Sequence, residues 1–321
     1  MENNDLKKWS LSMNDILKKI PSNIARAINE ENQVYLQQLV KRSVRDLQQI
    51  ARLDVNEANQ LLLYISKIVL AKSIIPVSEV KASGTITTGC SSIDTVLKGG
   101  ISLNGITEIY GESGVGKSQI CLQLCLTVQT IINSDIQQKG AVYICTEDVF
   151  PSQRLHQLAK LLPLRITNFG TQLKLEDNVF IAHVADFKQL NICLDAKLPR
   201  LLKNRAIGLI IIDSIAGAFR SENENINYSE RSLEFLTVAS KLNKLGQKYE
   251  AAIVCINQVT DNITTGKSEA CLGLAWKNLV SHRLYVCKLH NQIRKMEVIF
   301  SPYLKGNECH FTVKDTGVVN A

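Results

Sequence analysis

The chain has 321 residues, a formal net charge of +7, and a composition that is 45% hydrophobic and 21% charged. This balance is typical of a soluble globular protein, and the length allows one large core and a small second domain. No apolar run reaches the roughly 20 residues that a membrane-spanning helix needs, so we expect no membrane segment. The positive charge suits an acidic partner such as nucleic acid without requiring one.

The nine cysteines are scattered, and no C-x-x-C pair or histidine set completes a zinc site. We expect them to be reduced, small apolar residues of the core. Reduced cysteines place the protein in the cytosol or the nucleus.

Residues 1–70 are expected to form a small N-terminal helical domain. Apolar residues recur there at helical spacing and indicate three or four helices. Asp54, followed three residues later by Glu57, has the form of a capping box at a helix start.

Residues 71–85 differ in composition from the helical region before them. Pro76 cannot continue a helix, and small polar residues surround an apolar stretch at 74–77. We therefore expect a linker with one short extended piece.

Residues 86–321 alternate between strand-like and helix-like stretches, which predicts an α/β fold. The expected sheet is mostly parallel, with helices on both faces and antiparallel strands at the C-terminal end. The strand candidates are 106–110, 141–146, 178–184, 207–213 and 251–257. The helix candidates are 118–132, 152–162 and 232–249, and the late strands are 282–289, 295–300 and 309–315.

The stretch GESGVGKS at 111–118 satisfies the phosphate-binding pattern G-x-x-x-x-G-K-[ST] between a predicted strand and a predicted helix. Its glycines let backbone N–H groups approach phosphate oxygens, and the helix that follows adds its positive N-terminus. Lys117 would reach the β- and γ-phosphates, and the Ser118 hydroxyl would bind Mg²⁺. The predicted cofactor-binding residues are Gly111, Glu112, Ser113, Gly114, Val115, Gly116, Lys117 and Ser118.

Three polar residues follow or end predicted strands of the same sheet. Asp213 closes the apolar run IGLIIID and is a candidate Mg²⁺ residue, acting through water. Glu147 could orient or deprotonate the attacking water, and Gln258 could sense the γ-phosphate. Glu147 and Gln258 alone are each equally well explained as loop residues with satisfied hydrogen bonds, and Asp213 alone could cap a loop, but together at one sheet edge they favour a catalytic site.

Several segments resemble the eukaryotic RecA-type recombinase family. They are ITTGCSSIDTVLKGGISLNGITEIYGESGVGKSQ, IIDS, INQV and HRLYV, and the similarity runs from residue 86 to the end. VYICTEDVFPSQRLHQL, HVADFKQL and GLAWKNL resemble the DNA-repair paralogs within that family more closely. The resemblance implies a RecA-type P-loop ATPase core over 86–321 that binds ATP and Mg²⁺.

The resemblance also implies roles for individual residues. Lys117, Ser118, Asp213 and Glu147 match the family's P-loop lysine and hydroxyl, magnesium aspartate and water-activating glutamate. Arg154 matches an arginine that stacks on adenine, for which a planar guanidinium is suited. Gln258 matches the glutamine that couples ATP to a DNA-binding loop.

Two segments, 216–230 and 259–273, correspond to the loops that face DNA in this family. The candidate DNA-binding residues are Arg220 and Lys267 within these segments, and Arg231 directly after the first. The linker residues Ile74, Ile75 and Val77 lie where the family inserts an apolar segment into a neighbouring subunit's sheet edge.

The sequence also departs from the family's strand-exchange enzymes. Asp148 stands where these usually carry glycine, and Phe300 where they carry an acidic residue that caps the neighbour's ATP. Glu222 and Glu224 oppose DNA binding by the first loop, because carboxylates work against the phosphate contacts that dominate non-specific affinity.

These features favour an assembly protein of homologous-recombination repair in the nucleus. ATP would clamp a heterodimer with another recombinase paralog, and the pair would support recombinase filaments on single-stranded or branched DNA, with weak ATPase activity. The alternative is an enzyme that itself polymerises and exchanges strands, in mitotic or meiotic cells. A small-molecule kinase is disfavoured because the sequence offers no lid insertion between the P-loop helix and Glu147.

Overall fold

A computed structural model describes residues 16–30, 33–40, 42–70, 84–130, 138–162, 174–220, 228–262 and 267–321. Its internal contacts divide the chain into two units, Met1–Ala82 and Ser83–Ala321. The predicted subunit-contact residues Ile74, Ile75 and Val77 lie outside the described residues.

The first unit contains helices α2 (Ser22–Asn29), α3 (Gln33–Val40), α4 (Val44–Ala51) and α5 (Val55–Leu70). Their apolar faces meet in a separate hydrophobic core, because residues at helical spacing share one side of each helix. Its fully buried members include Ile24, Leu36, Leu47, Leu61 and Ile65.

The predicted capping box is confirmed at the start of α5. The Asp54 backbone N–H donates to Glu57 Oε2 at 3.1 Å, and the Glu57 N–H donates to Asp54 Oδ1 at 2.8 Å. These reciprocal bonds satisfy backbone donors that the first helical turn would leave unpaired. Ser43 and Asp46 form a second capping box at the start of α4.

The second unit is built on a nine-stranded sheet with the order β13-β12-β11-β10-β3-β7-β6-β4-β5. Strands β10, β3, β7, β6, β4 and β5 run parallel to one another, and β11, β12 and β13 continue the sheet from β10 in antiparallel pairs. The parallel strands are β3 (Ile106–Tyr110), β4 (Gly140–Cys145), β5 (Val179–His183), β6 (Ile207–Asp213), β7 (Ala252–Asn257) and β10 (His282–Lys288). The antiparallel strands are β11 (Arg294–Phe300), β12 (Glu308–Lys314) and β13 (Gly317–Asn320).

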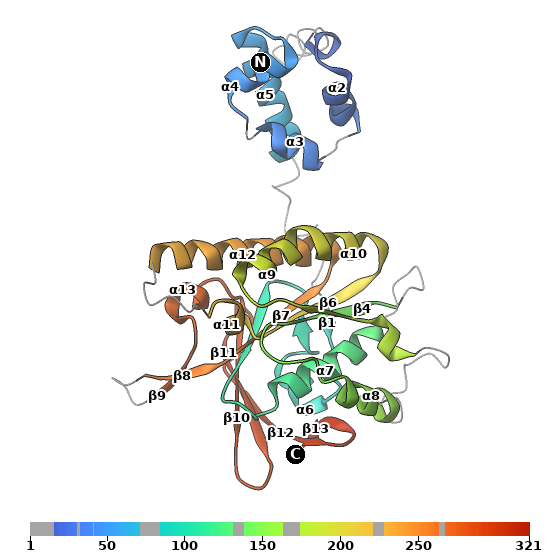
Figure 1. The fold of residues 1–321 in the computed structure, drawn as a ribbon, viewed down its shortest axis with the longest axis vertical. Helices are drawn as coiled ribbons and strands as arrows, with labels where there is room; N and C mark the ends of the chain where they lie inside the picture. The colour runs from blue at the N-terminus through green and yellow to red at the C-terminus, as the bar shows by residue number, and fades with distance from the viewer. Residues whose placement is uncertain are drawn as a thin grey trace. The chain divides into compact units, whose positions relative to one another are not determined.

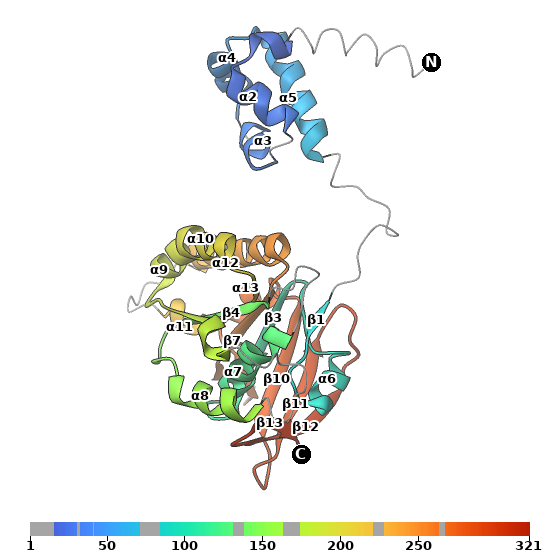
Figure 2. The same ribbon diagram turned by 90° about the vertical axis from the view of Figure 1, so that its right-hand side faces the viewer.

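Helices cover both faces of this sheet (Figures 1 and 2), as predicted. In β6, Leu209 and Ile211 join the core under helices α7 and α8, whereas Ile210 and Ile212 join the core under α9, α10 and α12. The alternation follows from the two-residue period of a strand, and burial on both faces explains the continuous apolar run. The helices are α7 (Lys117–Thr127), α8 (Ser152–Leu161), α9 (Phe187–Ile192), α10 (Leu198–Asn204) and α12 (Tyr228–Tyr249).

Shorter elements connect these layers. A π-helical turn, η5 (Cys193–Lys197), joins α9 to α10, and 3-10 turns occur at η2 (Val128–Thr130) and η4 (Leu175–Asn178). The short helices are α6 (Ser91–Val96), α11 (Ile215–Ala218) and α13 (Gly273–Lys277). Two small antiparallel ladders pair β1 (Thr85–Ile86) with β2 (Ile101–Ser102), and β8 (Val259–Asn262) with β9 (Lys267–Ala270).

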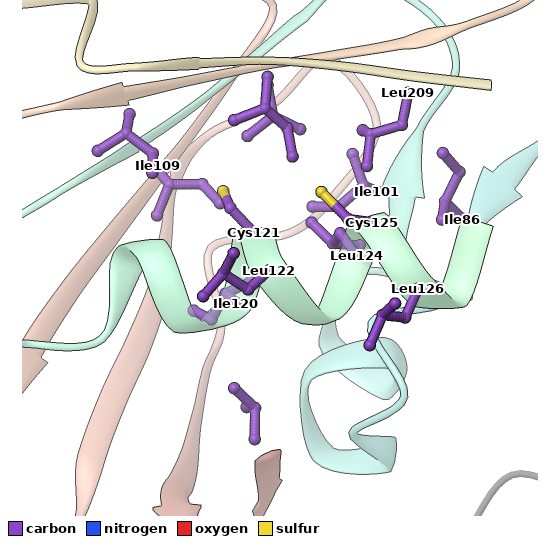
Figure 3. Close-up of a cluster of buried hydrophobic side chains, with 14 of the residues drawn as sticks. Ile86, Ile101, Ile109, Ile120, Cys121, Leu122, Leu124, Cys125, Leu126 and Leu209 are labelled. Carbon is purple, nitrogen blue, oxygen red and sulfur yellow. The ribbon is translucent and has the colours of Figure 1, made fainter. Parts of the chain in front are cut away.

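Helix α7, which follows the P-loop, is buried on all sides. Residues 120–127 are all buried, and Figure 3 shows Cys121 and Cys125 among isoleucine and leucine side chains, including Ile109 and Leu209 from the sheet. A helix buried all round needs no polar face, which accounts for the run ICLQLCLT. No helix among the described residues is both long and apolar enough to cross a bilayer.

The structure differs from the predicted elements in several places. Helices α9 and α10 were not predicted, and α12 begins at Tyr228, four residues earlier than predicted. Helix α7 ends at Thr127, earlier than predicted, and residues 131–137 lie outside the described part. Strand β10 is antiparallel to β11 but parallel to β3, so it belongs to both parts of the sheet. Within the segment 259–273, β8 and β9 form a hairpin.

Candidate nucleotide-binding site

Four neighbouring strands bring the predicted site residues together. β3, β7, β6 and β4 are adjacent in the sheet, and because they are parallel their carboxyl ends share one edge. The P-loop follows β3, Gln258 follows β7, Asp213 ends β6, and Glu147 lies two residues beyond β4. They surround a cavity of about 310 Å³ lined by Ser113, Gly114, Gly116, Lys117, Ser118, Gln119, Glu147, Asp148, Asp213, Ser214, Ile256 and Gln258.

The P-loop has the backbone that its glycines allow. Gly111 has a φ of 154°, and a Cβ atom there would lie 2.0 Å from the Val286 carbonyl oxygen, so a larger residue would displace β10. Lys117 begins α7, and its ammonium donates to the carbonyl oxygens of Gly111 at 2.7 Å and Glu112 at 2.6 Å. Burial lowers the pKa of Lys117, and the Asp213 carboxylate opposes this shift.

Asp213 is held by two hydroxyl groups. Ser118 Oγ donates to Asp213 Oδ2 at 2.8 Å, and the Tyr143 hydroxyl donates to the same oxygen. Burial raises the pKa of Asp213, and these two bonds and the charge of Lys117 oppose that shift.

This arrangement fits a magnesium ion bound to a triphosphate. Mg²⁺ keeps several waters and takes few protein oxygens besides those of the phosphates. Ser118 and Asp213 offer such oxygens at the foot of the P-loop. Within the described residues, no group of three His, Cys, Asp or Glu side chains would form an all-protein metal site.

Glu147 and Gln258 are in direct contact. Gln258 Nε2 donates to Glu147 Oε2 at 2.8 Å, and Ser214 Oγ donates to the same carboxylate oxygen at 2.7 Å. Gly217 makes this packing possible, because a Cβ atom there would lie 2.5 Å from Glu147 Cγ. The carboxylate and the amide therefore face the same cavity from β4 and β7.

A buried ion pair is linked to the backbone of Gln258 through Asn257. Arg283 Nε lies 2.5 Å from Glu108 Oε2, and Asn257 Nδ2 donates to Glu108 Oε1 at 2.7 Å. Asn257 Oδ1 in turn accepts the backbone N–H of Gln258 at 2.8 Å. Because unpaired buried charges are costly, this network fixes the end of β7 against β3 and β10.

Arg154, the predicted adenine contact, lies on α8 and is held against the β12–β13 turn. Its guanidinium donates to Gln119 Oε1 at 2.8 Å and to the carbonyl oxygens of Lys314 at 2.6 Å and Asp315 at 3.0 Å. These bonds fix the plane of the guanidinium, and a flat cation held in this way presents a face on which an aromatic ring can stack.

The predicted DNA-facing residues lie at three different places in the fold. Arg231 lies on α12, where it pairs with Glu234 at 3.4 Å and lies over the Phe219 ring. Lys267 begins β9, opposite Asn262. Arg220 instead reaches the nucleotide cavity, where its NH2 nitrogen lies 2.8 Å from Glu147 Oε1. Glu222 and Glu224 lie outside the described residues.

Of the two residues that depart from the family pattern, one lines the cavity and the other is exposed to solvent. Asp148 lines the cavity directly after Glu147. Phe300 is the last residue of β11 and is 51% exposed. An exposed phenylalanine presents an apolar contact at this position in place of an acidic one.

Sequence reasoning missed three contributors to the site. Tyr143 lies in the middle of an apolar strand, so only the structure shows its contact with Asp213. Ser214 directly follows the predicted magnesium aspartate, and this position in the sequence was the one signal that could have indicated it as a site residue. The contact between Arg220 and Glu147 joins residues far apart in the sequence, and no sequence pattern indicated it.

Most of the chain is similar to known proteins of one family. The Rad51 family model matches residues 81–321. DNA repair protein XRCC3 of Bos taurus is 35% identical over 249 residues, which cover 72% of this chain and 73% of the bovine protein. The DNA repair protein XRCC3 homolog of Arabidopsis thaliana is 32% identical over 73% of this chain and 92% of its own length. DNA repair protein rhp57 of Schizosaccharomyces pombe is 31% identical over 80% of this chain and 85% of its own.

Proposed function

Because this chain belongs to the Rad51 family, we propose that it is an ATP-binding paralog acting in homologous-recombination repair of DNA double-strand breaks. Membership of that family, with DNA repair protein XRCC3 among the relatives, confirms the predicted resemblance to a recombinase paralog. The observation that carries the proposal is the gathering of Lys117, Asp213 and Glu147 around one cavity.

The site would bind magnesium-ATP through residues of this chain. Backbone N–H groups of 113–118 and the Lys117 ammonium would hold the phosphates, and Ser118 with Asp213 would hold the magnesium side. Arg154 would stack on the adenine. When bound, the triphosphate supplies negative charge that a neighbouring subunit can recognise, and a bond whose hydrolysis ends that contact.

Glu147 would orient a water molecule, and Gln258 would report the γ-phosphate to the segment that follows it. The contact between their side chains at 2.8 Å supports this pairing of roles. The Cys271 backbone N–H donates to the Gln258 carbonyl oxygen at 2.9 Å, so Gln258 is also bonded to the far end of the β8–β9 hairpin.

The partner would be another recombinase paralog, joined as a heterodimer. Strand β5 pairs with β4 and has no second neighbour among the described strands, and Ile181 on it is exposed. An open strand edge with an apolar side chain is a template for strand addition. The partner's extended segment would pair there, and residues 74–77 of this chain would make the corresponding contact on another subunit.

The heterodimer would support recombinase filaments on single-stranded or branched DNA in the nucleus. Arg220, Arg231 and Lys267 are the candidate DNA contacts, and the net charge of +7 favours approach to phosphate. The segments that carry them begin at the same sheet edge as the nucleotide cavity.

A second candidate function is strand exchange by a self-assembling ATPase. The direct contact between Glu147 and Gln258 favours it, because this pair would link hydrolysis to DNA. Asp148, Glu222 and Phe300 favour the assembly role. Strong stimulation of ATP turnover by single-stranded DNA in the purified chain alone would favour strand exchange.

The proposal is tested by capturing the tagged chain from cells with and without ATP and identifying what is recovered. We expect another Rad51-family paralog, with a yield that depends on ATP. Lys117→Ala should abolish this dependence while circular dichroism shows an intact fold, because the P-loop loses its cation.

Lys241→Ala is the matched control, since Lys241 pairs with Asp195 on a helix away from the cavity lining. Its capture should equal that of the wild type. Recovery of the paralog at the same level with Lys117→Ala, or without ATP, would contradict a nucleotide clamp.

A further inference from the structure

Arg220 connects the first DNA-facing segment to the nucleotide site. Its NH2 nitrogen lies 2.8 Å from Glu147 Oε1 and donates to Gln258 Oε1 at 3.1 Å. One guanidinium therefore holds both the proposed water-orienting carboxylate and the proposed γ-phosphate sensor. Neither contact follows from the role that the sequence suggested for Arg220, which was DNA binding.

This contact completes the hydrogen bonding of Glu147. Oε2 accepts from Ser214 and Gln258, and Oε1 is paired with Arg220. A general base must accept a hydrogen bond from the water that it activates. A carboxylate whose two oxygens are already bonded to protein donors has reduced capacity to bind that water.

A phosphate of nucleic acid can also displace Glu147 and Gln258 from Arg220. The Arg220 side chain is 67% exposed, and exposed ion pairs are weak. Its remaining guanidinium nitrogens have no bonded partner among the described residues. A DNA phosphate is a strong competitor for such a cation, because phosphate contacts dominate DNA affinity.

Resting on the proposed function, we infer that Arg220 is a positioning residue that restrains Glu147 and Gln258 until a nucleic-acid phosphate engages it. DNA binding by the first segment then frees Glu147 to orient water. Because Gln258 is bonded to Cys271, the same event loosens the base of the β8–β9 hairpin. The Arg220 guanidinium thus connects the two DNA-facing segments to the hydrolytic site.

Arg220→Gln tests this in single-turnover ATP hydrolysis with the full chain in excess, with and without oligothymidine. For the wild type we expect slow hydrolysis that oligothymidine accelerates only by about two- to fivefold, well short of the strong stimulation that would favour strand exchange. The variant should hydrolyse ATP faster without DNA, by about two- to fivefold, which is the strength of an exposed ion pair. Oligothymidine should add little to that rate.

Two further measurements separate positioning from a merely structural role. The affinity for magnesium-ATP, measured by calorimetry, should be unchanged in Arg220→Gln, because the phosphates are held by the P-loop. Arg220→Lys keeps the charge but places it on a compact, flexible ammonium in place of the planar guanidinium, and its DNA-free rate should lie between the other two. Lys241→Gln loses a cation from the ion pair with Asp195 and should behave as the wild type.

The inference would be overturned if Arg220→Gln hydrolysed ATP without DNA at the wild-type rate and still responded to oligothymidine as the wild type does. A slower rate would also overturn it, since Arg220 would then assist hydrolysis directly. Failure of the wild type to bind nucleotide would overturn the proposed function as well. The affinity measurement distinguishes that result from the first two.

Discussion

At the scale of single residues, the site depends on stabilising the charge of Asp213. Burial raises the pKa of this carboxyl, and donors from Ser118 and Tyr143 offset the cost of its ionised form. Tyr143 therefore stabilises the ionised form of Asp213. The sequence indicates Asp213 as a site residue but gives no sign of this contact. The Tyr143 ring also packs edge-on against Phe150, with centroids 5.1 Å apart, so its ring position does not depend on the hydroxyl.

Tyr143→Phe should keep the packing and lose the hydrogen bond. We expect the free energy of unfolding to fall by about 1.5–3 kcal/mol, the range for a bond to a charged group. The affinity for nucleotide in the presence of magnesium should fall roughly tenfold, as for other residues that orient a metal ligand. Chemical denaturation and nucleotide titration measure the two effects. Tyr249→Phe, at the end of α12, is the control, and equal behaviour of the two variants would contradict this role.

At the scale of elements, the N-terminal unit relies on its helix caps. The capping box of α5 was readable from the sequence because its two residues are local, three positions apart. Asp54→Ala should lower the protection of the first-turn amides of α5 by about 1 kcal/mol in hydrogen exchange of the full chain. Asn56→Ala, an exposed change in the same turn, should leave it unchanged. Equal protection in Asp54→Ala and the wild type would mean that the cap is not formed in solution.

The same box makes α5 sensitive to acid. The Lys19 side chain and the Asp54 backbone N–H hold the pKa of Glu57 below its usual range. A lowered folded-state pKa contributes stability above the unfolded-state pKa and loses it as the pH falls through the folded-state pKa. Protection of α5 should therefore decline as the pH falls below the usual glutamate range. Glu57→Gln should remove this part of the pH dependence, and a pH profile like that of the wild type would contradict it.

Local pattern predicted the elements that carry the site. The bounds of β3 and β6 match the predicted strands. For β6 the reason is that a short run of apolar, branched residues is typical of a strand buried on both faces of a parallel sheet. The end of α7 was predicted too late, since its apolar residues continue beyond Thr127 and hide the boundary. The parallel pairing of β10 with β3 was not predicted, because pairing direction depends on a distant strand.

At the scale of the whole molecule, strand order decides which residues meet. The sequence predicted that Asp213, Glu147 and Gln258 lie at one sheet edge, but it did not give the order β3-β7-β6-β4 that brings them around the P-loop. Contacts such as that between Arg220 and Glu147 depend on this order, because the two residues follow adjacent strands, β6 and β4. Sequence reasoning therefore predicted most of the residues that line the cavity and missed the hydrogen bonds and ion pair that join them.

Titration calorimetry on the folded wild-type chain tests most directly whether this cavity binds magnesium-ATP. We predict a saturable heat with one nucleotide bound per chain, lost in Lys117→Ala and kept in Lys241→Ala. A folded wild-type protein that gives no heat with magnesium-ATP would contradict nucleotide binding at this cavity.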